Sequence, residues 1–148
     1  MQVIEAIKEY CHRQALPVPQ EQQGVLVAIL LDDQRVSLDY RPDAGALFLR
    51  APLPIPDLEQ PELAALYRRL LGANLLGLAL NGAYFAIDEE DESVELQYRL
   101  EASSVGSFVA VENALALLFG ACRRAIDDVL PESSLRSAPG MPSGFPPV

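Results

Sequence analysis

Residues 61–76 read PELAALYRRLLGANLL and begin the most informative part of the chain. As a helix, this stretch would be apolar on nearly every side, and only Arg68 and Arg69 clearly favour contact with water. A helix in a small domain turns one side toward its own core, so apolar residues on its other sides need a second cover. We expect another copy of the chain to supply that cover. The pattern therefore favours a dimeric binding protein over a monomeric enzyme.

Two strand patterns and a long helix follow this stretch. Residues 82–87 read GAYFAI and residues 94–100 read VELQYRL, with an acidic turn between them at 88–92. Residues 105–130 then repeat apolar side chains at steps of three and four, which is typical of an amphipathic helix. The face that we expect to be buried comprises Phe108, Val111, Leu115, Leu118, Phe119, Cys122, Ile126 and Val129.

The N-terminal half adds a helix and three strands. Residues 2–15 carry apolar side chains at helical spacing, and strand patterns follow at 25–31, 35–40 and 46–50. Short turns join the three strands, so neighbouring strands run antiparallel. We predict an α+β fold in the order α-β-β-β-α-β-β-α, with a twisted antiparallel five-stranded sheet covered by helices. Residues 1–130 form this single domain, and the Pro-, Gly- and Ser-rich residues 131–148 are expected to be a flexible tail.

Composition narrows the classes of partner. The 148-residue chain has a net charge of −10, and such an acidic chain repels a phosphate backbone. A partner with basic or amphipathic segments would be attracted instead. The N-terminus lacks the charged and apolar regions of a signal peptide, and the longest apolar run, 25–31, is too short to span a membrane. We expect a cytoplasmic protein that binds no nucleic acid and does not insert into membranes.

Little in the sequence supports catalysis. A single histidine, His12, excludes a two-histidine zinc site, and no phosphate-binding glycine loop occurs. Cys11 and Cys122 fit small core residues, with a disulfide or a catalytic thiol as the alternatives. The acidic residues 88–92 read as a solvated turn, with weak cation binding as the alternative. We expect no enzyme activity, no metal and no cofactor.

The strand at 25–31 is apolar at both parities, as is 46–49. In a strand, successive side chains point to opposite faces, so one set packs beneath the helices and the other needs a cover. Either a neighbouring helix covers both sets, or an exposed groove takes an extended peptide with apolar anchors.

Taken together, these patterns resemble the Tir-chaperone (CesT-like) family, the small dimeric chaperones of bacterial type III secretion. The similarity rests on the helix ending LLGANLL at 70–76, the strand AYFAID at 83–88, the acidic turn, the strand at 94–100 and the long last helix. Residues 2–51 match more weakly, and the tail is unmatched. The resemblance implies an ATP-independent homodimer around which the N-terminal segment of a secreted effector wraps.

The resemblance also implies positions for both contacts. The middle helix and the strand after it would form the dimer interface, at Leu63, Leu66, Tyr67, Leu70, Leu71 and Tyr84. The first helix and the first three strands would hold the effector, and the candidates there are Ile4, Ile7, Leu26, Ala28, Leu30, Val36, Leu38, Leu47 and Leu49.

Two other functions fit the sequence. One is a regulatory adaptor of similar fold that sequesters another protein, and only the identity of the bound protein would separate it from a chaperone. The other is a small enzyme that uses clustered carboxylates such as Asp88 and Glu90. It predicts an activity or a metal dependence that is lost when these two residues become Asn and Gln.

Overall fold

A computed structural model describes residues 2–17, 25–31, 34–75, 80–90 and 92–130. The chain forms α1 (Gln2–Arg13), β1 (Val25–Leu31), β2 (Gln34–Arg41), β3 (Ala46–Pro52), α2 (Glu62–Ala73), β4 (Tyr84–Asp88), β5 (Ser93–Glu101) and α3 (Phe108–Arg124). A π-helical turn, Ala125–Val129, continues α3. The α+β class and the order of elements predicted from the sequence are confirmed.

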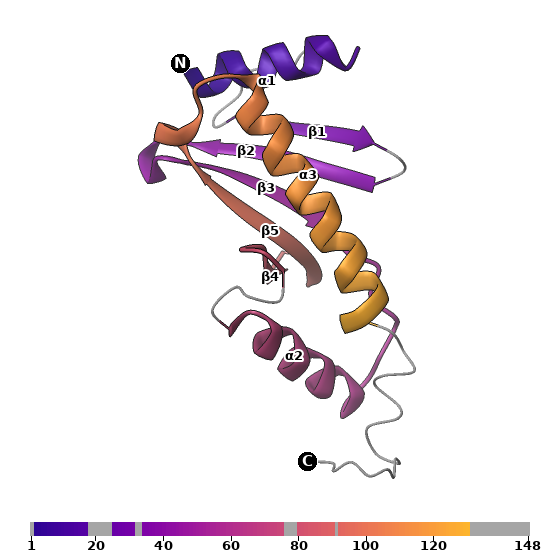
Figure 1. The fold of residues 1–148 in the computed structure, drawn as a ribbon. Coiled ribbons are helices and arrows are strands. Elements are labelled where there is room, and N and C mark those ends of the chain that lie inside the picture. The colour runs from indigo at the N-terminus through magenta and orange to yellow at the C-terminus, as the bar shows by residue number, and fades with distance from the viewer. Residues whose placement is uncertain (1, 18–24, 32–33, 76–79, 91, 131–148) are drawn as a thin grey trace.

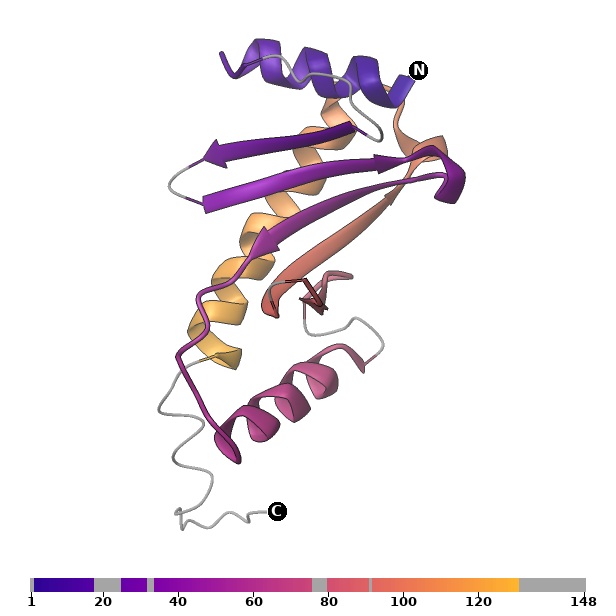
Figure 2. The same cartoon turned by 180° about the vertical axis from the view of Figure 1, so that it is seen from behind.

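The strands form one antiparallel sheet in the order β1-β2-β3-β5-β4. In Figure 1, α3 crosses one face of this sheet, α1 lies beside β1 and α2 lies beyond β4. The reverse view in Figure 2 shows the other face with no helix across it. We call this second face the open face. The expectation that helices cover the sheet therefore holds for one face only.

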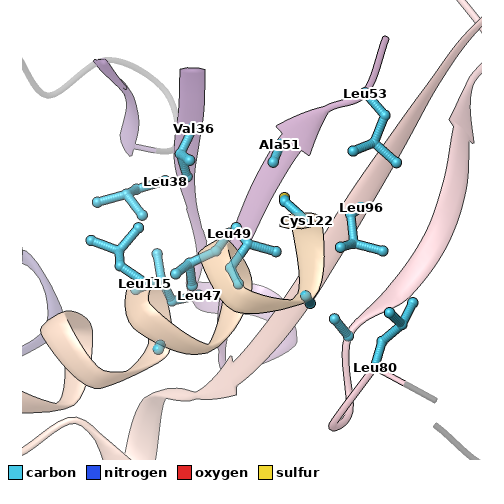
Figure 3. Close-up of a cluster of buried hydrophobic side chains, with 14 of the residues drawn as sticks. Val36, Leu38, Leu47, Leu49, Ala51, Leu53, Leu80, Leu96, Leu115 and Cys122 are labelled. Atoms are coloured by element: carbon cyan, nitrogen blue, oxygen red, sulfur yellow. The ribbon is translucent and has the colours of Figure 1, made fainter. Parts of the chain in front are cut away.

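The core lies between α3 and the sheet because register places the apolar residues of β2, β3 and β5 on one face. Leu38 pairs with Leu49, and Ala51 pairs with Leu96. Figure 3 shows Leu38 and Leu49 near Leu115 of α3, and Leu96 nearer to Cys122. Of the α3 face predicted from the sequence, Val111, Leu115, Leu118 and Cys122 are buried, Phe108, Phe119 and Val129 are half-buried, and Ile126 is exposed.

Candidate interaction surfaces

An apolar hollow lies between α2 and β4. It encloses about 340 Å³, and we call it the α2–β4 groove. Its walls comprise Tyr67, Leu70, Leu71, Asn74, Phe85, Ala86 and Ile87. Leu71 and Ile87 at its rim are 71% and 46% exposed, and Leu75, one turn after Leu71, is 70% exposed. An apolar groove with exposed leucines at its rim is the kind of surface that a protein partner covers.

Side-chain hydrogen bonds join α2 to the end of α3 and to β4. The guanidinium of Arg69 donates to the backbone carbonyl of Val129 at 3.2 Å from Nη2, which ties α2 to the end of α3. At the other side, Asn74 Oδ1 accepts from the backbone N–H of Phe85 at 2.7 Å, and Asn74 Nδ2 donates to the Phe85 carbonyl at 3.1 Å. The groove is therefore held by bonds within one chain. The sequence did not single out Asn74, because an Asn at the end of a helix needs no role beyond that helix.

The open face is polar at its centre. Arg50 on β3 makes two bonds to the Glu95 carboxylate of β5, at 2.6 and 3.0 Å. It also lies 3.3 Å from the Asp88 carboxylate of β4 and 3.8 Å from that of Asp39 on β2. Arg41 donates to Asp39 at 2.9 Å. Carboxylates from β2, β4 and β5 thus meet around Arg50 of β3, and we call Arg50, Asp39, Asp88 and Glu95 the Arg50 cluster. Such a surface is unlike the apolar groove that one alternative placed on these strands.

The described residues offer little chemistry for catalysis. Among them, no group of three or more His, Cys, Asp or Glu side chains is placed to hold a metal ion. Cys11 and Cys122 are free and buried, and burial raises the pKa of both thiols, that of Cys122 to about 11. Asp88 is paired with Arg50, and its other oxygen accepts from the Glu90 backbone N–H at 3.0 Å.

Across the portion of the chain with described structure, every helix is too short or too polar to cross a membrane.

Comparison with protein families gives a match over most of the chain. The model of the Tir chaperone protein (CesT) family matches residues 5–124. The chain belongs to this family. No curated protein sequence matches it significantly.

Solved structures share the fold of this CesT-family chain. A chain of the ExsC–ExsE complex superposes with a TM-score of 0.73 at 21% identity, covering 89% of this chain and 96% of the other. A chain of the HopA1–SchA chaperone–effector complex gives 0.62 at 14% identity, covering 82% and 91%. A chain of the ExoT–SpcS complex from Pseudomonas aeruginosa gives 0.58 at 15% identity, covering 83% and 96%. At these identities the likeness establishes the fold.

The residues assigned to the dimer interface of this CesT-family chain differ in how exposed they are. Leu71 is exposed, and Leu63, Tyr67 and Tyr84 are half-buried. Leu66 has no exposed surface, so its assignment to an interface was wrong: it anchors α2 to the core of its own chain. Leu70, only 4% exposed, lines the groove from below its rim. Whether a second copy covers this helix stays a prediction.

The residues assigned to effector binding divide by strand parity. Ile7, Val36, Leu38, Leu47 and Leu49 have no exposed surface, so their assignment to a binding surface was wrong. Ile7 lies on the side of α1 that packs against α3. The other four lie on the sheet face beneath α3. Ile4 is half-buried on α1. Leu26, Ala28 and Leu30 pair in register with Asp39, Ser37 and Arg35, and their assignment to effector binding stays a prediction.

Proposed function

We propose that this chain is a type III secretion chaperone. It acts as a homodimer, uses no ATP, and binds the extended N-terminal segment of a secreted effector so that the effector stays soluble and competent for secretion. The observation that carries the proposal is the apolar α2–β4 groove, which a single CesT-family chain leaves open with Leu71 and Ile87 exposed at its rim. Its site of action would be the bacterial cytoplasm, where effectors are made.

A second copy is the occupant that best fits the groove. Leu71 stands on α2 and Leu75 follows directly after its end. Bonds within the chain fix the position of α2, so the surface is ready before association. A preformed surface lowers the entropic cost of binding, which favours a stable pair of copies. Two copies related by a twofold axis would place their α2–β4 grooves against each other.

The effector would bind elsewhere, along α1 and β1. β1 is an end strand of the sheet, and an extended peptide can pair with an open strand edge while its side chains fill nearby pockets. Leu26, Ala28 and Leu30 of β1, together with Ile4 of α1, are the apolar residues that we propose for this contact. Similarity to chains from complexes that include a chaperone–effector pair supports this role.

The energetics suit tight binding that can still be reversed. Burial of about 1,000 Å² of apolar surface contributes about 25 kcal/mol before any opposing term. Ordering a disordered segment opposes much of that gain. Exchange of apolar surfaces therefore suffices to hold the effector without a nucleotide cycle.

Co-expression with candidate secreted proteins tests the function. Native mass spectrometry of the purified complex should give the mass of two copies of this chain and one effector, and limited proteolysis should leave the effector's N-terminal segment protected. A chain that stays monomeric and retains none of the candidates would contradict the proposal. Retention of a regulatory protein that is never secreted would indicate the adaptor instead.

A further inference from the structure

We propose that Asn74 closes the outer edge of β4 and so determines how a second chain can approach it: by packing side chains into the α2–β4 groove, and not by adding a strand. The consequence for a second copy rests on the proposed homodimer. The closing of the edge rests on the single chain alone.

The Asn74 side chain bonds to β4 in the way that one residue of a neighbouring strand would. β4 is the last strand of the sheet, and Phe85 pairs in register with Leu96 on its inner side. In an antiparallel sheet, alternate residues turn both backbone groups away from a given neighbour. Phe85 is such a residue, because its N–H and carbonyl both bond to Asn74, at 2.7 and 3.1 Å. A carboxamide carries the same donor and acceptor as a peptide group and can replace it here.

The same residue ends α2. The backbone N–H of Asn74 donates to the carbonyls of Leu70 and Leu71 at 3.1 and 3.2 Å, as the last turn of the helix closes. Backbone and side chain of Asn74 thus join the end of the helix directly to the middle of the strand. This link sets the position of Leu71 relative to Ile87 across the groove.

A strand that added to β4 would need the outward groups of Phe85. An unpaired strand edge is a template for another chain, and strand addition depends on a run of free backbone groups. β4 has only five residues, so occupation of Phe85 interrupts that run near its start. The groove remains accessible because it is lined by side chains.

Hydrogen exchange measured by NMR tests the bonds in the unmodified protein. The Phe85 backbone amide and the Asn74 side-chain amide should exchange slowly at every protein concentration, because each has its partner in the same chain. The side-chain amide of Asn113, which is exposed on α3, should exchange fast and serves as the internal reference. Fast exchange of the Asn74 side chain in the unmodified protein would overturn the proposal.

Two variants separate the bonds. Asn74→Ala removes both side-chain bonds to Phe85. The Phe85 amide should then exchange about tenfold faster, because its own acceptor is lost, while the β5 amides stay unchanged. In Asn74→Asp the carboxylate still accepts from Phe85, so that amide should stay slow. Asn113→Ala is the matched control and should change neither. An Asn74→Ala variant with a slow Phe85 amide would also overturn the proposal.

Concentration tests the consequence for association. In Asn74→Ala the open edge can accept a strand, so slow exchange at Phe85 should return as the protein concentration rises. If it does not return, Asn74 does not exclude strand addition. Light scattering gives an independent result: a monomer at all concentrations would contradict the proposed homodimer while leaving the measured closing of the edge intact.

Discussion

At the scale of single residues, the charges of the open face are the least expected feature. Glu95 and Asp39 are only 5% and 6% exposed, although no helix crosses that face. Burying a carboxylate is costly unless it is paired. Here Arg50 pairs with Glu95, and Asp39 is paired mainly with Arg41, with Arg50 at 3.8 Å. The cluster holds because one guanidinium satisfies carboxylates from the strands on both sides of it.

Replacing Arg50 should therefore cost far more than replacing another strand arginine. Arg50→Ala would leave Glu95 buried without a cationic partner and bonded only to the Gln97 side-chain amide. We expect the free energy of unfolding to fall by about 2–4 kcal/mol. Arg99→Ala is the matched control on β5, because its pair with Glu101 is exposed on both sides and such pairs contribute less than about 1 kcal/mol. Urea denaturation of both variants checks the difference, and equal losses would contradict the role given to Arg50.

Burial of Cys122 predicts slow chemistry at its thiol. The pKa is raised from 9.0 to about 11, so at pH 8 the folded protein holds about 100-fold less thiolate than an unfolded chain. Iodoacetamide labelling followed by mass spectrometry should be slower by about that factor in the folded state, with the urea-unfolded protein as the control. Equal rates in both states would show that the thiol is accessible.

The same shift predicts a pH dependence of stability. Folding favours the neutral thiol, so its contribution is fully present below pH 9.0 and is lost as pH rises toward about 11. The unfolding free energy of Cys122→Ala should therefore fall less steeply across this window than that of the unmodified protein. An unchanged slope would mean that other groups cause the loss.

Neither the Arg50 cluster nor the Asn74 link was predictable from the sequence. An arginine in a strand pattern reads as an ordinary surface residue, and only the register shows that Glu95 and Asp88 come from two further strands to meet it. Asn74 and Phe85 are eleven residues apart, with a helix end and a turn between them. Contacts of this kind depend on tertiary placement, which local patterns do not encode.

At the scale of elements, the patterns predicted the elements better than their buried faces. The alternation at 35–40 predicted β2, and the leucine-rich stretch predicted α2. Alternation alone does not say which set of side chains faces the core, and the set assigned to a partner, Val36 and Leu38 among it, proved to be the set beneath α3. That choice is made by the helix, which is distant in sequence.

The two faces of α2 give a paired prediction on adjacent leucines. Leu70→Ala removes a buried side chain and should lower the unfolding free energy by about 2–5 kcal/mol, whereas Leu71→Ala removes an exposed one and should change it by less than about 0.5 kcal/mol. Thermal or urea denaturation at a protein concentration low enough to dissociate any dimer checks both values. A large loss for Leu71→Ala under those conditions would contradict the exposure described for α2.

The same element carries the test of the homodimer. Leu71→Glu places a charge at the groove rim and should convert a dimer into a folded monomer, seen by light scattering with an unchanged circular dichroism spectrum. Leu117→Glu is the matched control, since Leu117 is a 40% exposed leucine on α3 away from the groove. A Leu71→Glu protein that remains dimeric would place the interface elsewhere.

At the scale of the whole molecule, the fold class could be predicted because periodicity and short turns determine which strands neighbour each other. What could not be predicted is that only one face is covered, since that depends on how three helices distribute around one sheet. The family match spans residues 5–124, and the division into a domain at 1–130 and a tail stays a prediction. Glu132 and Arg136 cancel in the tail, so residues 1–130 carry the entire net charge of −10.

That charge should affect how fast an effector binds more than how tightly it is held. Attraction between an acidic chaperone and a basic segment accelerates encounter and is screened by salt, whereas apolar burial is not weakened by it. Between 0.15 and about 1 M NaCl the association rate should fall by about tenfold, with the dissociation rate nearly constant. Surface plasmon resonance with an effector segment checks this, and a segment with Lys and Arg changed to Gln is the control that should lose the salt dependence. A dissociation rate that rises steeply with salt, at a constant association rate, would instead mean that ion pairs hold the bound segment and that apolar contacts do not.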